Sequence, residues 1–310
     1  MSQTLAARSV LEEEKPTRRR RRWRDGNGGL AVLALPAVVW YVIFTVGPLF
    51  AMFYIALLDW RSFVSPSEFA GLANFERVFN DPVFWTAVRN SVVQLAIVLP
   101  LMLPTAFMLG YYVSLKPRGH RILRVILFTP ALLSLAAMSV IFLSIFSPTG
   151  LINGVLVNIG LGQFSTPWLA SSQTAFGVVM VVNLWSGIGF TAILFSARLS
   201  AIPGDVFEAA ELDGANHWRR VWGIAYPICR DYFGVILMLQ FIWVLFTSAG
   251  TILLLTRGGP GSSSTNLSFL IYDKAFTQSQ VGYSQAVGVI LFFVGIIGML
   301  LIRRIFRPRY

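Results

Sequence analysis

The sequence predicts an all-α protein that crosses a membrane six times. Hydrophobic residues make up 55% of its 310 residues and charged residues only 13%, whereas soluble domains carry about 25% charge. The apolar residues gather into stretches of roughly 20 or more, the length that a helix needs to cross a bilayer. Apolar and polar residues do not alternate with a period of two, so the pattern does not favour a membrane β-barrel.

Six apolar stretches follow one another along the chain. Prolines fall inside the first three, and membrane helices tolerate proline where neighbouring groups satisfy the freed backbone. We therefore expect a basic tail at 1–29, a six-helix membrane domain at 30–306 with a polar loop at about 198–231, and a short C-terminal segment at 307–310. The predicted spans are Leu30–Leu58, Asn90–Leu115, Ile122–Phe146, Thr174–Ala197, Tyr232–Leu255 and Ser284–Phe306.

The basic residues are distributed unevenly over the two sides of this arrangement. The net charge is +11, and 20 of the 25 Lys and Arg residues lie in the tail or directly after spans two, four and six. Because cytoplasmic loops of membrane proteins are enriched in Lys and Arg, we expect both termini in the cytoplasm. The run Arg18–Arg22 fits a topology signal that contacts membrane lipid. The chain has no basic domain interleaved with aromatic residues, which argues against nucleic-acid binding.

Residues that would support catalysis or metal binding are scarce. Cys229 is the sole cysteine, and His120 and His217 lie in different loops without the spacing of metal ligands. The sequence has no phosphate-cradling glycine loop followed by lysine, and spans two to six hold almost no ionisable residue at depth. We therefore expect no catalytic residue, no metal site and no cofactor in this chain.

The polar loop between spans four and five predicts two short helices. Pro203 suits the first turn of a helix, Glu208 is acidic near its positive end, and Gly214 after Asp213 suits a left-handed stop. A second, amphipathic helix would then lie at the membrane surface and end at Pro227. Its apolar face would carry Trp218, Val221, Trp222 and Ala225. From these patterns alone, the pair could simply anchor the loop at the interface.

The order of residues in this loop resembles the docking loop of ABC importer permeases. Its similarity rests on Glu208-Ala209-Ala210, Asp213-Gly214-Ala215, Ile224 and Pro227, although Val221, Tyr226 and Asp231 depart from the usual pattern. Shorter matches lie in the first and last outer loops, at 69–75, 81–85 and 255–283. The resemblance is to the first permease subunit of the maltose/glycerol-3-phosphate class. It implies a type I importer fold in which these loop residues contact an ATPase.

Polar and aromatic side chains near the middle of spans three to five predict a substrate pathway. Transporters bind substrate near the bilayer midplane, and a buried amide such as Asn183 or Gln240 must face protein or a cavity. The candidates from position are Ser134, Asn183, Trp185, Gln240, Trp243 and Ser248. The resemblance adds Gly187 and Phe190, and also supports Asn183 and Ser248. The alternative for the polar residues is hydrogen bonding between helices.

The resemblance implies a permease subunit of an ATP-driven sugar importer in a bacterial inner membrane. It also implies a second permease subunit, two ATPase subunits that hold ATP and Mg²⁺, and an extracytoplasmic solute-binding protein. An importer of glycerol-3-phosphate or another polyol is the alternative within the family. An intramembrane enzyme would need buried catalytic groups, which the spans lack, and a passive channel would not need the loop around Glu208.

Overall fold

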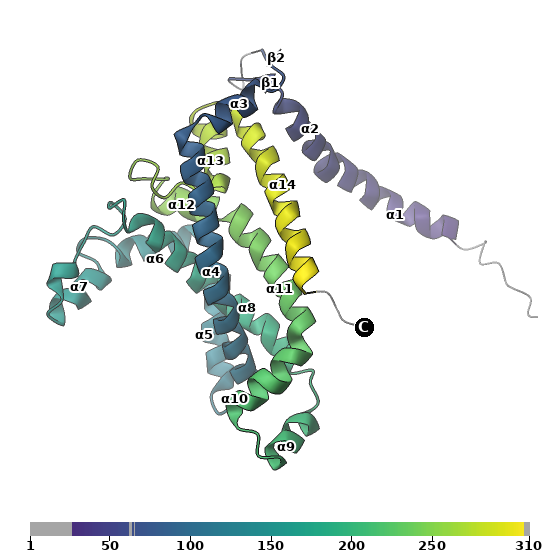
Figure 1. Cartoon of the computed structure of the whole chain (residues 1–310), viewed down its shortest axis with the longest axis vertical. Helices are drawn as coiled ribbons and strands as arrows, with labels where there is room; N and C mark the ends of the chain where they lie inside the picture. The colour runs from purple at the N-terminus through teal and green to yellow at the C-terminus, as the bar shows by residue number, and fades with distance from the viewer. Residues whose placement is uncertain (1–26, 62–63, 65, 307–310) are drawn as a thin grey trace, which may run out of the picture. The chain divides into compact units, whose positions relative to one another are not determined.

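The fold is described from a computed structural model, which describes residues 27–61, 64 and 66–306. The basic run Arg18–Arg22 and the segment 307–310 lie outside these residues. The described chain divides between Phe50 and Ala51 into two units, and Figure 1 shows their elements. The first unit holds α1 (Asn27–Tyr41), the π-helical turn η1 (Val42–Val46) and the start of α2 (Gly47–Ile55). Together these helices form an apolar segment long enough to span a membrane, Leu33–Ile55.

The second unit is almost wholly helical. Two antiparallel strands of two residues each, β1 (Leu58–Asp59) and β2 (Glu68–Phe69), lie between α2 and the next helix. The elements that follow are α3 (Ala73–Phe79), α4 (Pro82–Ser114), α5 (His120–Leu132), α6 (Leu135–Ile145), α7 (Leu151–Asn158), η2 (Gly162–Phe164), α8 (Ala175–Leu199), α9 (Gly204–Leu212), α10 (His217–Arg220), η3 (Val221–Ala225), α11 (Tyr226–Thr247), α12 (Ala249–Leu255), α13 (Leu267–Tyr272), η4 (Asp273–Thr277) and α14 (Val281–Ile305).

The all-α membrane fold predicted from the sequence is confirmed, with one change in the third span. Within the described residues, five helical segments are long and apolar enough to cross a membrane. The predicted third span is instead two helices, α5 and α6, which are bent by 102° at their junction. Leu133 is extended there, and the Ser134 side chain accepts a hydrogen bond from Ala137 N at 3.2 Å to begin α6. This serine cap starts a new helix where a continuous one was expected.

Two helix boundaries also differ from the prediction. Helix α4 begins at Pro82, eight residues before Asn90, because Asp81 caps it by accepting from Val83 N at 2.8 Å. Residues 82–85, expected in an outer loop, are therefore helical. Pro227 does not end a helix, since the chain is helical from His217 to Thr247. The π-helical turn η3 lies just before Pro227, and such a turn accommodates a residue that lacks a backbone donor.

The core of the second unit lies where α4 packs against α8 and α11, and α14 packs on α11. Phe107 of α4 packs edge-on against Phe195 of α8, with ring centroids 5.4 Å apart. The backbones approach closely at two glycines, where a Cβ would collide with a neighbouring carbonyl. Gly110 of α4 faces Ala192, and Gly189 of α8 faces Leu127 of α5. Small residues of this kind allow membrane helices to pack tightly.

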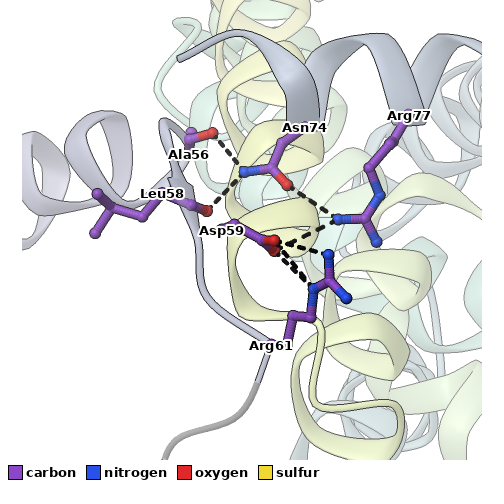
Figure 2. Close-up of polar contacts among 6 residues, drawn as sticks. All are labelled: Ala56, Leu58, Asp59, Arg61, Asn74 and Arg77. Carbon is purple, nitrogen blue, oxygen red and sulfur yellow. Dashed lines mark hydrogen bonds and ion pairs between the residues drawn. The ribbon is translucent and has the colours of Figure 1, made fainter. Parts of the chain in front are cut away.

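A polar cluster ties the β1–β2 segment to α3 (Figure 2). Asn74 Nδ2 donates to the carbonyls of Ala56 and Leu58, at 3.0 and 2.7 Å. Asp59 accepts from Arg61 Nη2 at 2.8 Å and lies 3.8 Å from Arg77 Nη1. The Arg61 hydrogen bond lowers the pKa of the Asp59 carboxyl. The lowered pKa reflects the stabilisation of the ionised Asp59 carboxylate by the neighbouring guanidinium group.

Candidate functional site

A cavity of ≈ 700 Å³ lies between the α5–α6 bend, α8 and α11. The bend opens this space because α6 turns away from the axis of α5. Its lining residues are Pro130, Ala131, Leu133, Leu135, Met138, Ser186, Gly187, Phe190, Leu194, Leu239, Gln240, Trp243, Thr247 and Thr251. None of them carries a charge, and its volume falls in the range of small-molecule sites, about 300–1,000 Å³.

Four of the predicted pathway residues line this cavity: Gly187, Phe190, Gln240 and Trp243. Gln240 is 5% exposed, and its Nε2 donates to Thr191 Oγ1 at 2.8 Å. The same Thr191 hydroxyl donates to the Gly187 carbonyl at 2.7 Å. Gln240 Oε1 is buried and has no hydrogen-bond partner among the described residues. The Gln240 amide, the rings of Phe190 and Trp243 and the hydroxyl-bearing residues Ser186, Thr247 and Thr251 thus surround one space.

The other four predicted residues do not line the cavity. Asn183 is buried behind it and accepts from Thr251 Oγ1 at 3.2 Å. Ser248 is also buried and accepts from Asn266 Nδ2 at 2.6 Å. Trp185 packs edge-on against Phe142, with ring centroids 5.3 Å apart. Ser134 caps α6, although both of its chain neighbours contribute to the lining. For Asn183 and Ser248 the geometry favours the alternative, hydrogen bonding between helices.

Several lining residues were not predicted from the sequence. Those of α5 and α6 belong to a span that was expected to be straight, and Pro130 within it was the available signal of irregularity. Thr251 was missed because α12 was expected to continue span five rather than to follow a break at Ser248. Thr251 contributes to the lining, although its hydroxyl donates to Asn183 Oδ1 at 3.2 Å.

The polar loop between α8 and α11 forms a projection of two short helices, α9 and α10. Helix α9 ends in a Schellman motif, in which Gly214 N donates to Glu211 O at 3.0 Å and Ala215 N donates to Ala210 O at 2.9 Å. Gly214 has φ +74°, so it supplies the predicted left-handed stop. Asp213 is the C-cap, and Asn216 then caps α10 by accepting from Arg219 N at 2.9 Å.

Aromatic contacts hold this projection against the end of α4. The Tyr111 ring lies 6.2 Å from the Phe207 ring and 5.2 Å from the His217 ring. Arg220 Nη1 also bonds Glu211 Oε2 at 2.9 Å, which links α10 to α9. With Phe207 turned inward, the opposite face of α9 is exposed and displays Glu208, Ala209 and Leu212.

The loop residues outside α9 are placed differently from the prediction. Val221 and Ala225 are fully buried, whereas Trp218 and Trp222 are exposed, so these four residues do not share one environment. Ile224 is half-buried within η3, and Pro227 is exposed at the start of α11. Leu212 was not predicted as a functional residue, yet its side chain is 90% exposed at the tip of α9.

Comparison with known proteins identifies the family. Residues 102–310 match the family described as binding-protein-dependent transport system inner membrane component. The match covers more than half of the chain, so the chain belongs to this family. It is 33% identical over 297 residues to the diacetylchitobiose uptake system permease protein NgcF of Streptomyces coelicolor, covering 89% of this chain and 81% of NgcF.

Other relatives and a solved structure agree with this assignment. The chain is 30% identical to the sulfoquinovosyl glycerol transport system permease protein SmoG of Agrobacterium fabrum, covering 97% of this chain and 98% of SmoG. A bacterial ABC transporter involved in the import of the acidic polysaccharide alginate has the same fold, with a TM-score of 0.80 and 21% identity. That match covers 91% of this chain and 96% of the other. The predicted resemblance to carbohydrate ABC permeases and the type I importer fold are confirmed.

Proposed function

We propose that this permease passes a neutral sugar or short oligosaccharide through the cavity beside Gln240 and Trp243. The uncharged cavity lining is the single observation that carries this choice of substrate. Amides and hydroxyls can exchange hydrogen bonds with sugar hydroxyls, and the faces of Phe190 and Trp243 suit the C–H face of a pyranose ring. A glycerol phosphate would call for a basic side chain, which this half of the pathway lacks.

Energy for transport comes, in this proposal, from ATP and Mg²⁺ bound to a pair of partner ATPase subunits. Helix α9 is the docking element, because it is braced from behind by Phe207 and exposes Glu208, Ala209 and Leu212. Small residues allow a partner surface to approach the helix closely, and an exposed leucine offers an anchor for an apolar pocket. A second permease subunit completes the pathway, and an extracytoplasmic binding protein delivers the sugar at the opposite end.

Replacement of a negative by a positive side chain on α9 tests the docking proposal. Glu208→Lys places a cation on the proposed interface, so co-purification of the ATPase and substrate-stimulated ATP hydrolysis should fall at least tenfold. Glu68→Lys makes the same charge change on the exposed strand β2 and should leave both unchanged. Equal ATPase recovery from the two variants would contradict docking through α9.

A pair of glycine variants tests whether the shape of the projection matters. Gly214→Val forces a branched side chain to adopt φ +74° and should disrupt the end of α9. Gly71→Val imposes similar strain, at φ +58°, in the segment between β2 and α3. We expect only Gly214→Val to reduce ATPase recovery. A comparable loss in both variants would show that general destabilisation explains the result.

Ligand binding by the associated solute-binding protein tests the substrate class. A panel of neutral mono- to oligosaccharides, glycerol-3-phosphate and free polyols would be measured by calorimetry, followed by uptake of the best ligand. We expect a neutral saccharide to bind tightly and to be transported. Tight binding and uptake confined to a phosphorylated polyol would overturn the proposed substrate while leaving the docking proposal intact.

A further inference from the structure

A second cavity, of ≈ 310 Å³, lies along α5, and it shares no lining residue with the proposed sugar pathway. Its lining residues are Arg121, Arg124, Val125 and Phe128 of α5, and Ile193 of α8. The close approach of α5 and α8 at Gly189 brings Ile193, one turn further along α8, next to α5. The cavity is therefore a groove between two tightly packed helices.

The groove is basic at one end and apolar at the other. Arg121 and Arg124 lie in the first turns of α5, and Val125 and Phe128 follow on the same helical stripe at i+4 and i+7 from Arg121. Residues at this spacing stand above one another on a helix surface. Along the axis of α5, the guanidinium groups therefore come first in the groove, and the apolar side chains follow them.

The two arginines lack anionic partners among the described residues. No ion pair or hydrogen bond joins Arg121 or Arg124 to any of the described residues, whereas Arg61, Arg77 and Arg220 each pair with a carboxylate. A guanidinium presents a planar fork of donors that matches a phosphate group. The groove therefore offers positive charge that the rest of the described chain does not neutralise.

The basic end of the groove lies toward the end of the second unit from which α9 projects. Helix α5 follows the short turn after α4, and Tyr111 near the end of α4 contacts both α9 and α10. Figure 1 shows α9 and α10 at the same end of the second unit. In the orientation on which the proposed function rests, this end faces the cytoplasm and the anionic leaflet.

We propose that the groove binds one anionic phospholipid. Its phosphate would pair with Arg121 and Arg124, and the first part of an acyl chain would lie over Val125, Phe128 and Ile193. Charge complementarity favours the headgroup, and the apolar continuation along the axis of α5 favours a lipid over a soluble anion. Phospholipid bound here would hold α5 against α8 beside the α5–α6 bend, and would so link membrane composition to the geometry of the cavity.

Native mass spectrometry of the assembled transporter, titrated with short-chain phosphatidylglycerol, tests this proposal. Phosphatidylcholine and inorganic phosphate serve as comparison ligands. The variant Arg121→Gln/Arg124→Gln should reduce phosphatidylglycerol binding about 10- to 30-fold, as expected for two basic side chains at a membrane surface. Arg303→Gln/Arg304→Gln removes the same charge from the exposed end of α14 and should retain binding.

A third variant separates lipid from a simple anion. Val125→Trp fills the apolar part of the groove but keeps both arginines, so it should also weaken phosphatidylglycerol binding. Equal binding of phosphatidylcholine, binding of inorganic phosphate alone, or equal losses in the two arginine pairs would overturn the proposal. Loss of the second permease subunit from the arginine variant would instead assign the groove to a subunit interface. Because lipid binding is measured without ATP or sugar, its failure is distinguishable from failure of the proposed function.

Discussion

Trp243 and Trp185 lie on neighbouring helices but have different surroundings. Trp243 lines the main cavity together with Phe190 and Gln240. Trp185 is 40% exposed, packs against Phe142 and does not reach the lining. The two residues thus form a matched pair, with the same indole ring at a similar depth in the sequence of each span. One ring can contact a substrate, and the other can affect transport only through packing.

Alanine variants of these tryptophans should therefore behave differently. Trp243→Ala removes an aromatic surface from the cavity, and we expect uptake to fall about tenfold, since stacking contacts contribute about 0.5–1.5 kcal/mol beyond simple burial. Trp185→Ala should lower the thermal stability of the assembled transporter and change uptake per folded complex less than twofold. Uptake by complexes matched for expression is the measurement. Larger losses for Trp185→Ala would show that the cavity is not the pathway.

The position of a residue along a predicted span indicated its depth in the membrane, but not the direction in which its side chain points. Gln240 and Trp243, which were predicted from their position near a span midpoint, line the cavity. Asn183 was predicted at the same depth, yet it faces Thr251 behind the lining. Each residue rotates the side chain by about 100° around a helix, so the lining depends on how neighbouring helices pack. The sequence of one span does not define that packing.

Helix α8 packs against two neighbouring helices, α5 and α4, through glycines. Gly189 faces the backbone of Leu127 on α5, so the two helices are nearly in backbone contact. Gly187 faces Met102 of α4, where an added Cβ would meet the end of a flexible side chain. Gly177, nearer the start of α8, has open space within 4 Å of the position that a Cβ would take. The same helix therefore contains both a sensitive and a tolerant glycine.

Valine substitutions at Gly189 and Gly177 should separate packing from helix propensity. Both add a branched side chain to the same membrane helix. Gly189→Val must push α5 away, and overpacking of this kind costs about 1–3 kcal/mol or more, so we expect a lower thermal midpoint and a smaller folded yield. Gly177→Val should match the wild type. Size-exclusion profiles and thermal unfolding in detergent provide the measurements, and equal stability of the two variants would contradict the close α5–α8 approach.

Element boundaries show where sequence patterns are insufficient. The hydropathy of 122–146 is continuous, so it predicts one span, but Leu133 adopts an extended conformation and Ser134 starts a second helix. The hydropathy of a segment does not depend on the direction of its helix axis, so a bend of 102° leaves the hydropathy unchanged. Pro227 gave the opposite error, because a proline was expected to end a helix that in fact continues after a π-helical turn. In contrast, the end of α9 at Gly214 followed directly from local backbone chemistry.

The second unit has two chemically different ends. The elements β1, β2 and α3 lie at one end and the α9–α10 projection at the other (Figure 1). Acidic Asp81 at the first end pairs with Lys274 at 3.3 Å, so charge there is largely balanced. The α4–α5 turn and the first turns of α5 instead carry Lys116, Arg118, Arg121 and Arg124 and no acidic residue. This asymmetry follows the positive-inside rule and leads to a specific orientation in the membrane.

Accessibility of single cysteines to a membrane-impermeant thiol reagent should establish that orientation. Cys229 is fully buried, and Cys229→Ser provides a background without it. Ser165→Cys and Thr277→Cys, in connections predicted to face outward, should be labelled in intact cells. Arg118→Cys and Asp213→Cys, near the opposite end, should be labelled only after the membrane is permeabilised.

All four positions are exposed in the structure, so a failure to react in intact cells reports the side of the membrane rather than burial. Labelling after permeabilisation is the control for each variant, because it shows that the thiol is accessible once the reagent can cross the membrane. Labelling of Asp213→Cys from outside intact cells would place α9 away from the cytoplasm. A cytoplasmic ATPase could not then reach Glu208 or Leu212, so this one result would overturn both the orientation and the docking proposal.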